Sequence, residues 1–179
     1  MILFYIEDIG FDNILPISSD LLALFSIGKV NGIVLDSGHK KSSVISIIEG
    51  CCLKYTYQKI DYSGYKVDNY ISSILNIDLE SSKYIKENID SSKLTEIDND
   101  KLNFIVLPDG KKINFKKDFI LSLIDMPFKT TSKIHNNLNI QELIFDSLLK
   151  IDYESRRELT SNLLVCGGNT LIPKFNDLL

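Results

Sequence analysis

The chain has 179 residues, of which 44% are hydrophobic and 25% charged, a balance typical of a folded globular protein rather than a disordered one. Its 20 basic and 24 acidic side chains give a formal net charge of −4. A chain without a basic excess does not bind DNA, RNA or anionic lipid through its overall charge, so we expect neither a nucleic acid nor a membrane as a direct partner.

The cysteines give an indication of the redox environment. There are three, an odd number, and they lie in apolar runs without metal-type spacing to either histidine: Cys51, Cys52 and Cys166. We therefore expect buried, reduced thiols in an intracellular protein, either cytoplasmic or nuclear.

The amino-terminal part predicts two apolar elements. The run Ile2–Ile6 predicts a strand, or the end of a helix whose start is missing, and it lacks the basic leader of a signal peptide and the length of a membrane span. After Pro16, the polar residues Ser18–Asp20 offer an N-cap for a helix over Leu21–Ile27 that ends at Gly28. Its apolar residues are densely spaced, so we expect this helix to be largely buried.

A β-meander follows this helix. The branched residues Ile33–Leu35 predict a strand buried on both faces, which runs into the polar loop Asp36–Gly38. The next apolar run, Val44–Ile48, follows too soon for a helix to intervene, so the two strands predict a hairpin. A third strand is expected over Cys52–Tyr55. The hairpin tip can offer N–H groups to an anion and a carboxylate to a metal or water, and an ordinary polar turn is the alternative.

The middle of the chain changes to helical periodicity and then back to strands. Apolar spacing predicts a helix over Val67–Leu75 after a turn at Asp61–Gly64, and a second helix over Lys83–Ile89. The polar stretch Ser91–Lys101 predicts a solvated connection. The turn signal Pro108–Gly110 lies between two short apolar runs and predicts a second hairpin.

The remaining segments continue the alternation of helix and strand. We expect the following elements: the strands Phe104–Leu107 and Ile113–Phe115, a helix over Lys116–Leu123 broken by Pro127, a polar loop over Lys129–Asn139, helices over Ile140–Ile151 and Glu154–Ser161, a buried strand over Leu163–Val165, and a helix over Leu171–Leu179 with Pro173 in its first turn.

Two of the predicted buried strands end in glycine-bearing polar loops, Asp36–Gly38 and Gly167–Thr170. Loops at the carboxyl ends of strands line the ligand crevice of an α/β sheet, and glycines let the backbone approach a phosphate or a base closely. The two loops therefore predict a nucleotide cleft. For Gly167 and Gly168 alone, tight packing at the entry to a helix is the alternative.

Several segments resemble a known family. Gly32–Gly38 followed by Ile47–Gly50 resembles the second phosphate loop and the next strand of actin and the actin-related proteins. Four further segments agree with that family in order and spacing: Asp61–Tyr70, Leu107–Gly110, Arg156–Leu159 and Cys166–Pro173. The resemblance extends from about Leu21 to Leu179.

The resemblance implies a fold class. It is the α/β fold of actin, in which two RNase H-like halves enclose ATP and a divalent metal, and this chain is similar to the second half only. A mixed sheet flanked by helices would then form a large inner subdomain from residues 1–61 and 126–179, with a smaller α+β outer subdomain, residues 62–125, inserted into it. The rest of the fold would lie outside this chain.

The resemblance also implies a site for ATP or ADP with Mg²⁺ or Ca²⁺. Asp36 would contact the metal through water, Gly38 would donate to phosphate, and Lys86 with Glu87 would lie beside the adenosine. A solvated helix face is the alternative for Lys86 and Glu87. The residues implied at the site are Asp36, Ser37, Gly38, His39, Lys40, Gly64, Lys86, Glu87, Gly167, Gly168 and Asn169.

Three positions depart from the family pattern. His39 and Lys40 stand where actin has an acid and a glycine. The histidine removes one anchor of the metal's water shell, and the lysine cannot adopt a backbone conformation that only glycine allows. Ser43 stands where actin has a histidine associated with hydrolysis. Lys40 and Lys41 offer positive charge to phosphate instead. These departures count against ATPase activity. The resemblance also assigns the family's first phosphate loop and the position that orients the attacking water to the other half of the fold, so we expect no ATP hydrolysis by this chain alone.

Three functions are consistent with these features. The first is an actin-related protein that serves as a structural subunit, with an intact or degenerate nucleotide site, in a cytoskeletal or chromatin-associated assembly of other protein subunits. The second is an ATP-hydrolysing member of the superfold that contains actin, sugar kinases and heat-shock chaperones. The third is a fragment that acts only as a protein-interaction module.

Overall fold

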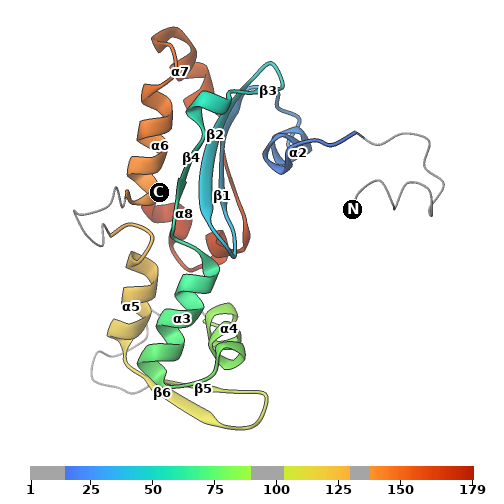
Figure 1. The fold of residues 1–179 in the computed structure, drawn as a ribbon. Coiled ribbons are helices and arrows are strands. Elements are labelled where there is room, and N and C mark those ends of the chain that lie inside the picture. Colours follow the sequence, from blue (N-terminus) through green and yellow to red (C-terminus); the bar gives the residue numbers. More distant parts are fainter. Residues whose placement is uncertain (1–14, 90–102, 130–137) are drawn as a thin grey trace, which may run out of the picture.

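The computed structural model describes residues 15–89, 103–129 and 138–179 (Figure 1). The predictions for Ile2–Ile6 and Ser91–Lys101, and most of the predicted loop Lys129–Asn139, lie outside the described residues.

The described helices and strands alternate along the chain. The helices are α2 (Ser19–Ser26), α3 (Gly64–Leu75), α4 (Leu79–Glu87), α5 (Lys117–Asp125), α6 (Ile140–Leu149), α7 (Tyr153–Thr160) and α8 (Phe175–Leu178), with short 3-10 turns η1 (Lys54–Thr56) and η3 (Gly168–Leu171). The strands are β1 (Gly32–Ser37), β2 (Ser42–Ile48), β3 (Cys51–Cys52), β4 (Gln58–Ile60), β5 (Asn103–Val106), β6 (Lys112–Phe115) and β7 (Leu163–Cys166).

The main sheet is mixed. Its strand order is β3-β2-β1-β7, and β4 pairs with β2 as well. β1 runs antiparallel to β2 but parallel to β7. This arrangement of helices around a mixed sheet confirms the predicted α/β class.

The strand β1 is buried on both faces, as predicted. Ile33 and Leu35, 1% and 0% exposed, belong to the cluster that includes residues of α6 and α7, whereas Val34, 0% exposed, packs in a second cluster with Leu24 of α2. Figure 1 shows α6 and α7 on one side of the sheet and α2 on the other. Alternate residues of a strand point to opposite faces, so β1 contributes to two separate cores.

The predicted third strand of the meander is wrong in its extent. We expected it to reach Tyr55, but β3 ends at Cys52, and after the turn η1 the chain returns to β2 as the separate strand β4. The buried side chain of Thr56 explains the interruption. Its hydroxyl accepts a hydrogen bond from Ser46 N at 3.0 Å and donates to Leu53 O at 2.8 Å, which holds the turn against β2.

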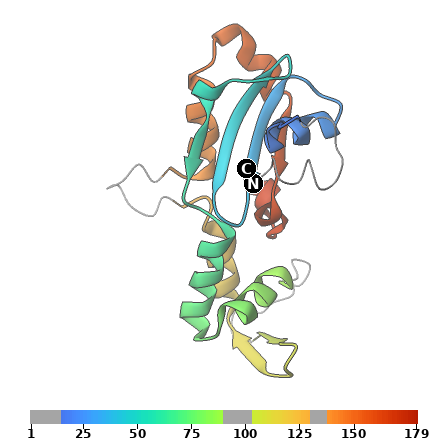
Figure 2. The same ribbon diagram turned by 45° about the vertical axis from the view of Figure 1, so that its right-hand side comes forward.

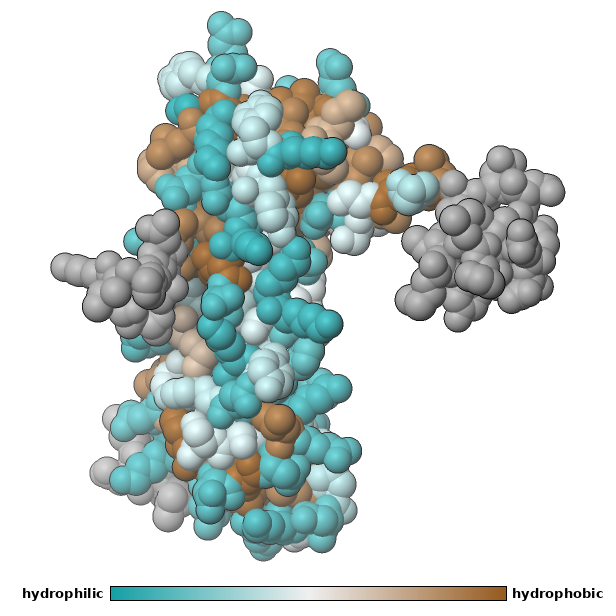
Figure 3. Space-filling model, in the orientation of Figure 1, coloured by the Kyte–Doolittle hydropathy of each residue, from teal (hydrophilic) through white to brown (hydrophobic). Residues whose placement is uncertain are grey.

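Helix α2 forms where it was predicted, but the expectation that it is largely buried is wrong. Only Leu24 is buried, while Leu22, Phe25 and Ile27 are 50%, 43% and 50% exposed. A helix that packs on one face of a sheet buries a single stripe of residues, and the main contacts of α2 are with β1 and β7 on that face. Apolar side chains therefore remain on this surface of the molecule (Figure 3).

The elements between β4 and α6 lie together at one end of the molecule. Helices α3, α4 and α5 and the two-stranded sheet β5–β6 occupy this end, below the main sheet in Figures 1 and 2. The hairpin β5–β6 confirms the turn predicted at Pro108–Gly110, and Gly110 has the positive φ of 84° that the turn requires. Helix α5 ends at Asp125, two residues before Pro127, as the proline predicted.

The helix predicted over Leu171–Leu179 is wrong at its start. The chain first forms the 3-10 turn η3, in which Thr170 N donates to Gly167 O and Ile172 N to Asn169 O. Lys174 then adopts a left-handed conformation with φ of 62°, and α8 begins only at Phe175. Pro173 therefore lies between two helical segments rather than in the first turn of one.

The three cysteines are free thiols, but the expectation that all are buried is wrong, because Cys51 is exposed at the end of the short strand β3. Burial raises the pKa of the Cys166 thiol to about 11, with smaller contributions from the negative charges of Asp36 and Asp20. Across the described residues, no helix combines the length and the apolar character needed to cross a bilayer.

Candidate functional site

The tip of the β1–β2 hairpin contacts the first turn of α3. Gly38 O accepts a hydrogen bond from Gly64 N at 3.0 Å, and His39 O accepts one from Tyr65 N at 2.9 Å. The side chain of Ser63 accepts from Lys66 N at 3.3 Å. All three donors are N–H groups that a helix leaves without intrahelical partners. The hairpin tip therefore caps the first two residues of α3, and Ser63 caps the third.

A third loop joins this contact. Asn169, in η3, is 4% exposed, and its side-chain amide donates to Gly38 O at 2.9 Å and lies 3.4 Å from Ser37 Oγ. The hairpin tip, the start of α3 and the loop after β7 are therefore held together by hydrogen bonds, among them those of the buried Asn169 side chain. Removing one partner of such a bond leaves an unsatisfied buried group, which costs about 1–3 kcal/mol.

Two glycines allow these segments to approach one another. A Cβ at Gly64 would lie 2.9 Å from Asn169 Oδ1 and 3.2 Å from Lys86 Nζ. A Cβ at Gly167, where φ is 95°, would lie 2.6 Å from Asp36 Oδ1 and overlap the carbonyl oxygen of Ser37. Close packing between β7 and β1 thus requires Gly167, which supports the packing alternative for this residue.

A cavity of about 370 Å³ opens where these loops meet α4. Small-molecule sites in proteins usually measure about 300–1,000 Å³, so its size suits a ligand such as a nucleoside. The residues that line it are His39, Gly64, Lys83, Lys86, Glu87, Ile89, Gly168, Asn169, Leu171 and Ile172. Six of the eleven residues that the sequence placed at a nucleotide site are among them.

The other five predicted residues do not line the cavity. Asp36 is on the α2 face of β1, because it has the same strand parity as Val34. Ser37 Oγ lies 2.8 Å from Ser42 Oγ, and Lys40 is exposed. Gly38 N donates to Lys41 O at 3.0 Å and closes the hairpin turn, so its predicted role as a phosphate donor requires that bond to be exchanged. Gly167 packs against β1.

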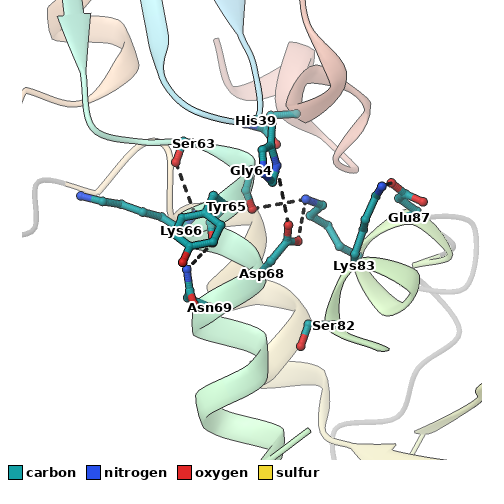
Figure 4. A network of polar contacts seen from close by, with 12 residues as sticks. His39, Ser63, Gly64, Tyr65, Lys66, Asp68, Asn69, Ser82, Lys83 and Glu87 are labelled. Carbon is teal, nitrogen blue, oxygen red and sulfur yellow. Dashed lines mark hydrogen bonds and ion pairs between the residues drawn. The ribbon is translucent and has the colours of Figure 1, made fainter. Parts of the chain in front are cut away.

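Two lysines of α4 differ in their surroundings. The side chain of Lys86 is only 13% exposed and lies 2.6 Å from the buried carboxylate of Asp68, and its Nζ also donates to Gly64 O at 3.3 Å. Lys83 and Glu87 form a 4.0 Å ion pair in which both side chains are more than half exposed (Figure 4). The solvated-face alternative is therefore wrong for Lys86, whereas the Glu87 side chain is exposed beside the cavity.

Asp68 is the charged residue at this site that the sequence reasoning missed. A signal was present, because Asp68 falls on the buried stripe of α3, which consists of Gly64, Val67, Asp68 and Ile71. A carboxylate within the apolar stripe of a helix is rarely buried without a partner. Its position thus predicts a cationic side chain nearby, which the structure identifies as Lys86.

A second hollow, of about 770 Å³, lies along α3 and is lined by residues such as Asp61, Lys66 and Pro127. It is larger than the cavity at Lys86, but none of the residues predicted for the nucleotide site lines it. We place the candidate site in the smaller cavity, because hydrogen-bonded loops from three parts of the chain form its wall.

Metal ligands are sparse in this region. Among residues 15–89, 103–129 and 138–179, no cluster of three or more His, Cys, Asp or Glu side chains could hold a metal ion. A magnesium ion bound with a nucleotide keeps several waters and takes other ligands from the phosphates, so it does not need such a cluster. The water-mediated role of Asp36 stays a prediction.

The partly buried carboxyl of Asp36 should make the stability of the protein depend on pH. Burial raises the pKa of its carboxyl above the ordinary value of 3.8, the charge of Asp20 raises it further, and Lys41 lowers it. The folded state then holds the proton more tightly than the unfolded chain, so the free energy of unfolding falls as the pH rises above 3.8. Asp36→Asn should therefore stabilise the protein at pH 7 by a few tenths of a kcal/mol, roughly, because solvent screens this partly exposed group.

Urea titrations at pH 7 and at pH 3 measure this effect. The gain from Asp36→Asn should disappear at pH 3, where the wild-type carboxyl is protonated in both states. Asp177→Asn, on the exposed surface of α8, is the matched control. A gain of equal size at both pH values would show that the ionisation of Asp36 is not its cause.

Comparison with known proteins assigns the chain to a family. The family model for actin matches residues 2–102 and 79–179, which together cover nearly the whole sequence. The chain belongs to the actin family. The resemblance found in its motifs is thus confirmed, and the family as a whole generally binds nucleotide.

The individual relatives of this actin-family chain are distant. It is 29% identical over 180 residues to the putative actin-29 of Dictyostelium discoideum, an alignment that covers 89% of this chain and 46% of that protein. It is 28% identical over 173 residues to actin-like protein 7A of Rattus norvegicus, covering 86% and 38%. An actin-like protein of Neurospora crassa is 27% identical over 187 residues, covering 89% and 47%. The chain thus spans less than half the length of these curated relatives.

Proposed function

We propose that this actin-family chain binds ATP or ADP, with the nucleoside in the cavity lined by Lys86 and Asn169, and serves as a structural subunit of a cytoskeletal or chromatin-associated assembly in the cytoplasm or nucleus. The observation that carries the proposal is the convergence of three loops on that cavity. Lys86 offers donors and Glu87 offers acceptors to a nucleoside. Gly168 has no atom within 4 Å of the position of a Cβ, so its backbone is open to a ligand.

The finer fold assignment is part of this proposal. The main sheet with α2, α6, α7 and α8 would form the inner, RNase H-like subdomain from residues 1–61 and 126–179. The helices α3 to α5 and the hairpin β5–β6 would form the inserted outer subdomain, residues 62–125. Their separation to the two ends of the molecule in Figure 1 supports this division.

Binding without efficient hydrolysis is the form of the function that the residues support. His39 and Lys40 occupy the hairpin tip, and Ser43, on β2, is 4% exposed. A serine hydroxyl does not accept a proton near neutral pH as a histidine does, so Ser43 cannot act as a general base in the way that a histidine can. Hydrolysis by this chain would therefore need another group to activate water.

The exposed apolar side chains of α2 support the proposal that the chain binds partner subunits. Leu22 is 50% exposed on α2, and Phe25, whose ring lies beside Gly50, is still 43% exposed. We propose that another protein subunit covers this surface. A monodisperse monomer at high concentration in light scattering would count against this partner role.

A titration with a fluorescent ATP analogue tests the nucleotide proposal. Lys86→Met removes the buried ammonium at the cavity, and we expect it to weaken binding by about tenfold or more, which corresponds to about 1.4 kcal/mol. Lys59→Met is the matched control, because Lys59 is exposed on β4 and does not line the cavity. No saturable binding by the wild-type chain, or equal weakening in the control, would overturn the proposal.

A further inference from the structure

The buried carboxylate of Asp68 lies behind the wall of the cavity. Its side chain is 4% exposed, with Oδ1 2.6 Å from Lys86 Nζ and Oδ2 3.9 Å from His39 Nδ1. Figure 4 shows Asp68 pointing from α3 toward His39 at the hairpin tip. The carboxylate thus lies between two residues that line the cavity, although Asp68 does not line it itself.

The contact with Lys86 is an ion pair between two desolvated groups. Asp68 Oδ1 accepts no hydrogen bond of regular geometry, so the attraction of opposite charges at 2.6 Å is the main interaction that compensates its burial. Removing one partner of a buried ion pair typically costs about 3–5 kcal/mol, because the other charge is left uncompensated. Asp68 therefore fixes the ammonium group of Lys86 at the edge of the cavity.

This pairing changes what Lys86 can recognise. An ammonium group has three N–H donors, and Gly64 O accepts from one of them at 3.3 Å. A second N–H group faces Asp68 at 2.6 Å, so at most one donor is left for a ligand in the cavity, and Asp68 already neutralises the positive charge. A neutralised, oriented donor suits an uncharged acceptor such as a ring nitrogen or a sugar oxygen better than a phosphate, whose negative charge favours an ammonium group without a counter-ion.

We infer that Asp68 is a positioning residue that holds Lys86 as a donor to the uncharged, nucleoside part of the ligand and keeps phosphate groups away from that end of the cavity. The inference rests on the proposed nucleotide function and extends it to selectivity. Loss of the Asp68 charge should shift the selectivity toward ATP, because the unpaired Lys86 then attracts phosphate.

The variant Asp68→Asn tests this inference, since asparagine keeps the shape of the side chain and removes its charge. We expect Asp68→Asn to weaken adenosine binding by about tenfold relative to ATP binding, measured as the ratio of the two Kd values by calorimetry. A role limited to folding would weaken both ligands together and leave that ratio unchanged. Asp61→Asn is the control, because Asp61 forms an exposed ion pair with Lys66 outside the cavity.

The double variant Asp68→Asn/Lys86→Met separates binding from stability. It contains neither charge, so it should unfold less readily than Asp68→Asn alone. If Asp68 acts through Lys86, the double variant should bind adenosine with the same Kd as Lys86→Met. Two results would overturn the inference: an unchanged ratio of the adenosine and ATP Kd values in Asp68→Asn, or weaker adenosine binding in the double variant than in Lys86→Met. In either case, nucleotide binding by the wild type would still support the proposed function. No binding of either ligand by the wild type would overturn both.

Discussion

Replacing Gly167 with alanine should lower the free energy of unfolding by about 2–4 kcal/mol. Gly167 has φ of 95°, a conformation that residues with a Cβ rarely adopt. The added methyl group would also lie 2.6 Å from Asp36 Oδ1 and overlap the Ser37 carbonyl. That carbonyl cannot move away easily, because β1 is paired on both sides, with β2 and with β7. The substitution therefore strains the backbone and the junction of the two strands together.

Two other glycines provide matched controls in chemical denaturation. Gly168→Ala should change stability by less than about 0.5 kcal/mol, because no atom lies within 4 Å of the new Cβ. Gly110→Ala should cost about 1 kcal/mol, since its φ is 84° but its surroundings are open. The difference between Gly167 and Gly110 isolates the effect of the clash. Equal losses at these two positions would mean that β1 and β7 do not pack as closely as the structure shows.

The parts of the fold that the sequence predicted well are those determined by local signals. The apolar run Ile33–Leu35 and the turn Pro108–Gly110 each carry their information in consecutive residues, and the structure confirms both. The interruption between β3 and β4 was not predictable in this way. It depends on the hydrogen bond between Ser46 N on β2 and Thr56 Oγ1 in the turn η1, whose approach no local pattern encodes.

The candidate site shows the same division between local and long-range information. The resemblance to actin identified Lys86 and Asn169, which the structure brings to one cavity. It also grouped Asp36 with Gly38, and these two residues are close, since a Cβ at Gly38 would lie 3.8 Å from Asp36 Oδ1. Neither residue lines the cavity, and the water-mediated role of Asp36 stays a prediction. The pairing of Asp68 with Lys86 depends on how α3 packs against α4, which periodicity alone does not determine.

Truncating Leu24 to alanine should destabilise the protein by about 2–4 kcal/mol, because it removes a fully buried side chain and leaves a cavity. Leu24 is 0% exposed and packs with Val34, Ile45 and Ile47 on one face of the sheet. It is the only fully buried residue within α2, and the partly buried Leu21 packs against the same cluster, so the attachment of this helix depends largely on Leu24. We therefore expect Leu24→Ala to lose helical circular dichroism from α2 before the main transition in a urea titration.

Leu22→Ala is the matched control on the same helix. Leu22 is 50% exposed, so the same chemical change should cost less than about 0.5 kcal/mol in the isolated chain. A loss as large as that of Leu24→Ala would contradict the exposure of this surface and would mean that Leu22 is covered in solution. Self-association would then make the unfolding midpoint rise with protein concentration, whereas packing within one chain would leave it constant. The pair of variants thus measures whether the outer surface of α2 is free to bind a partner.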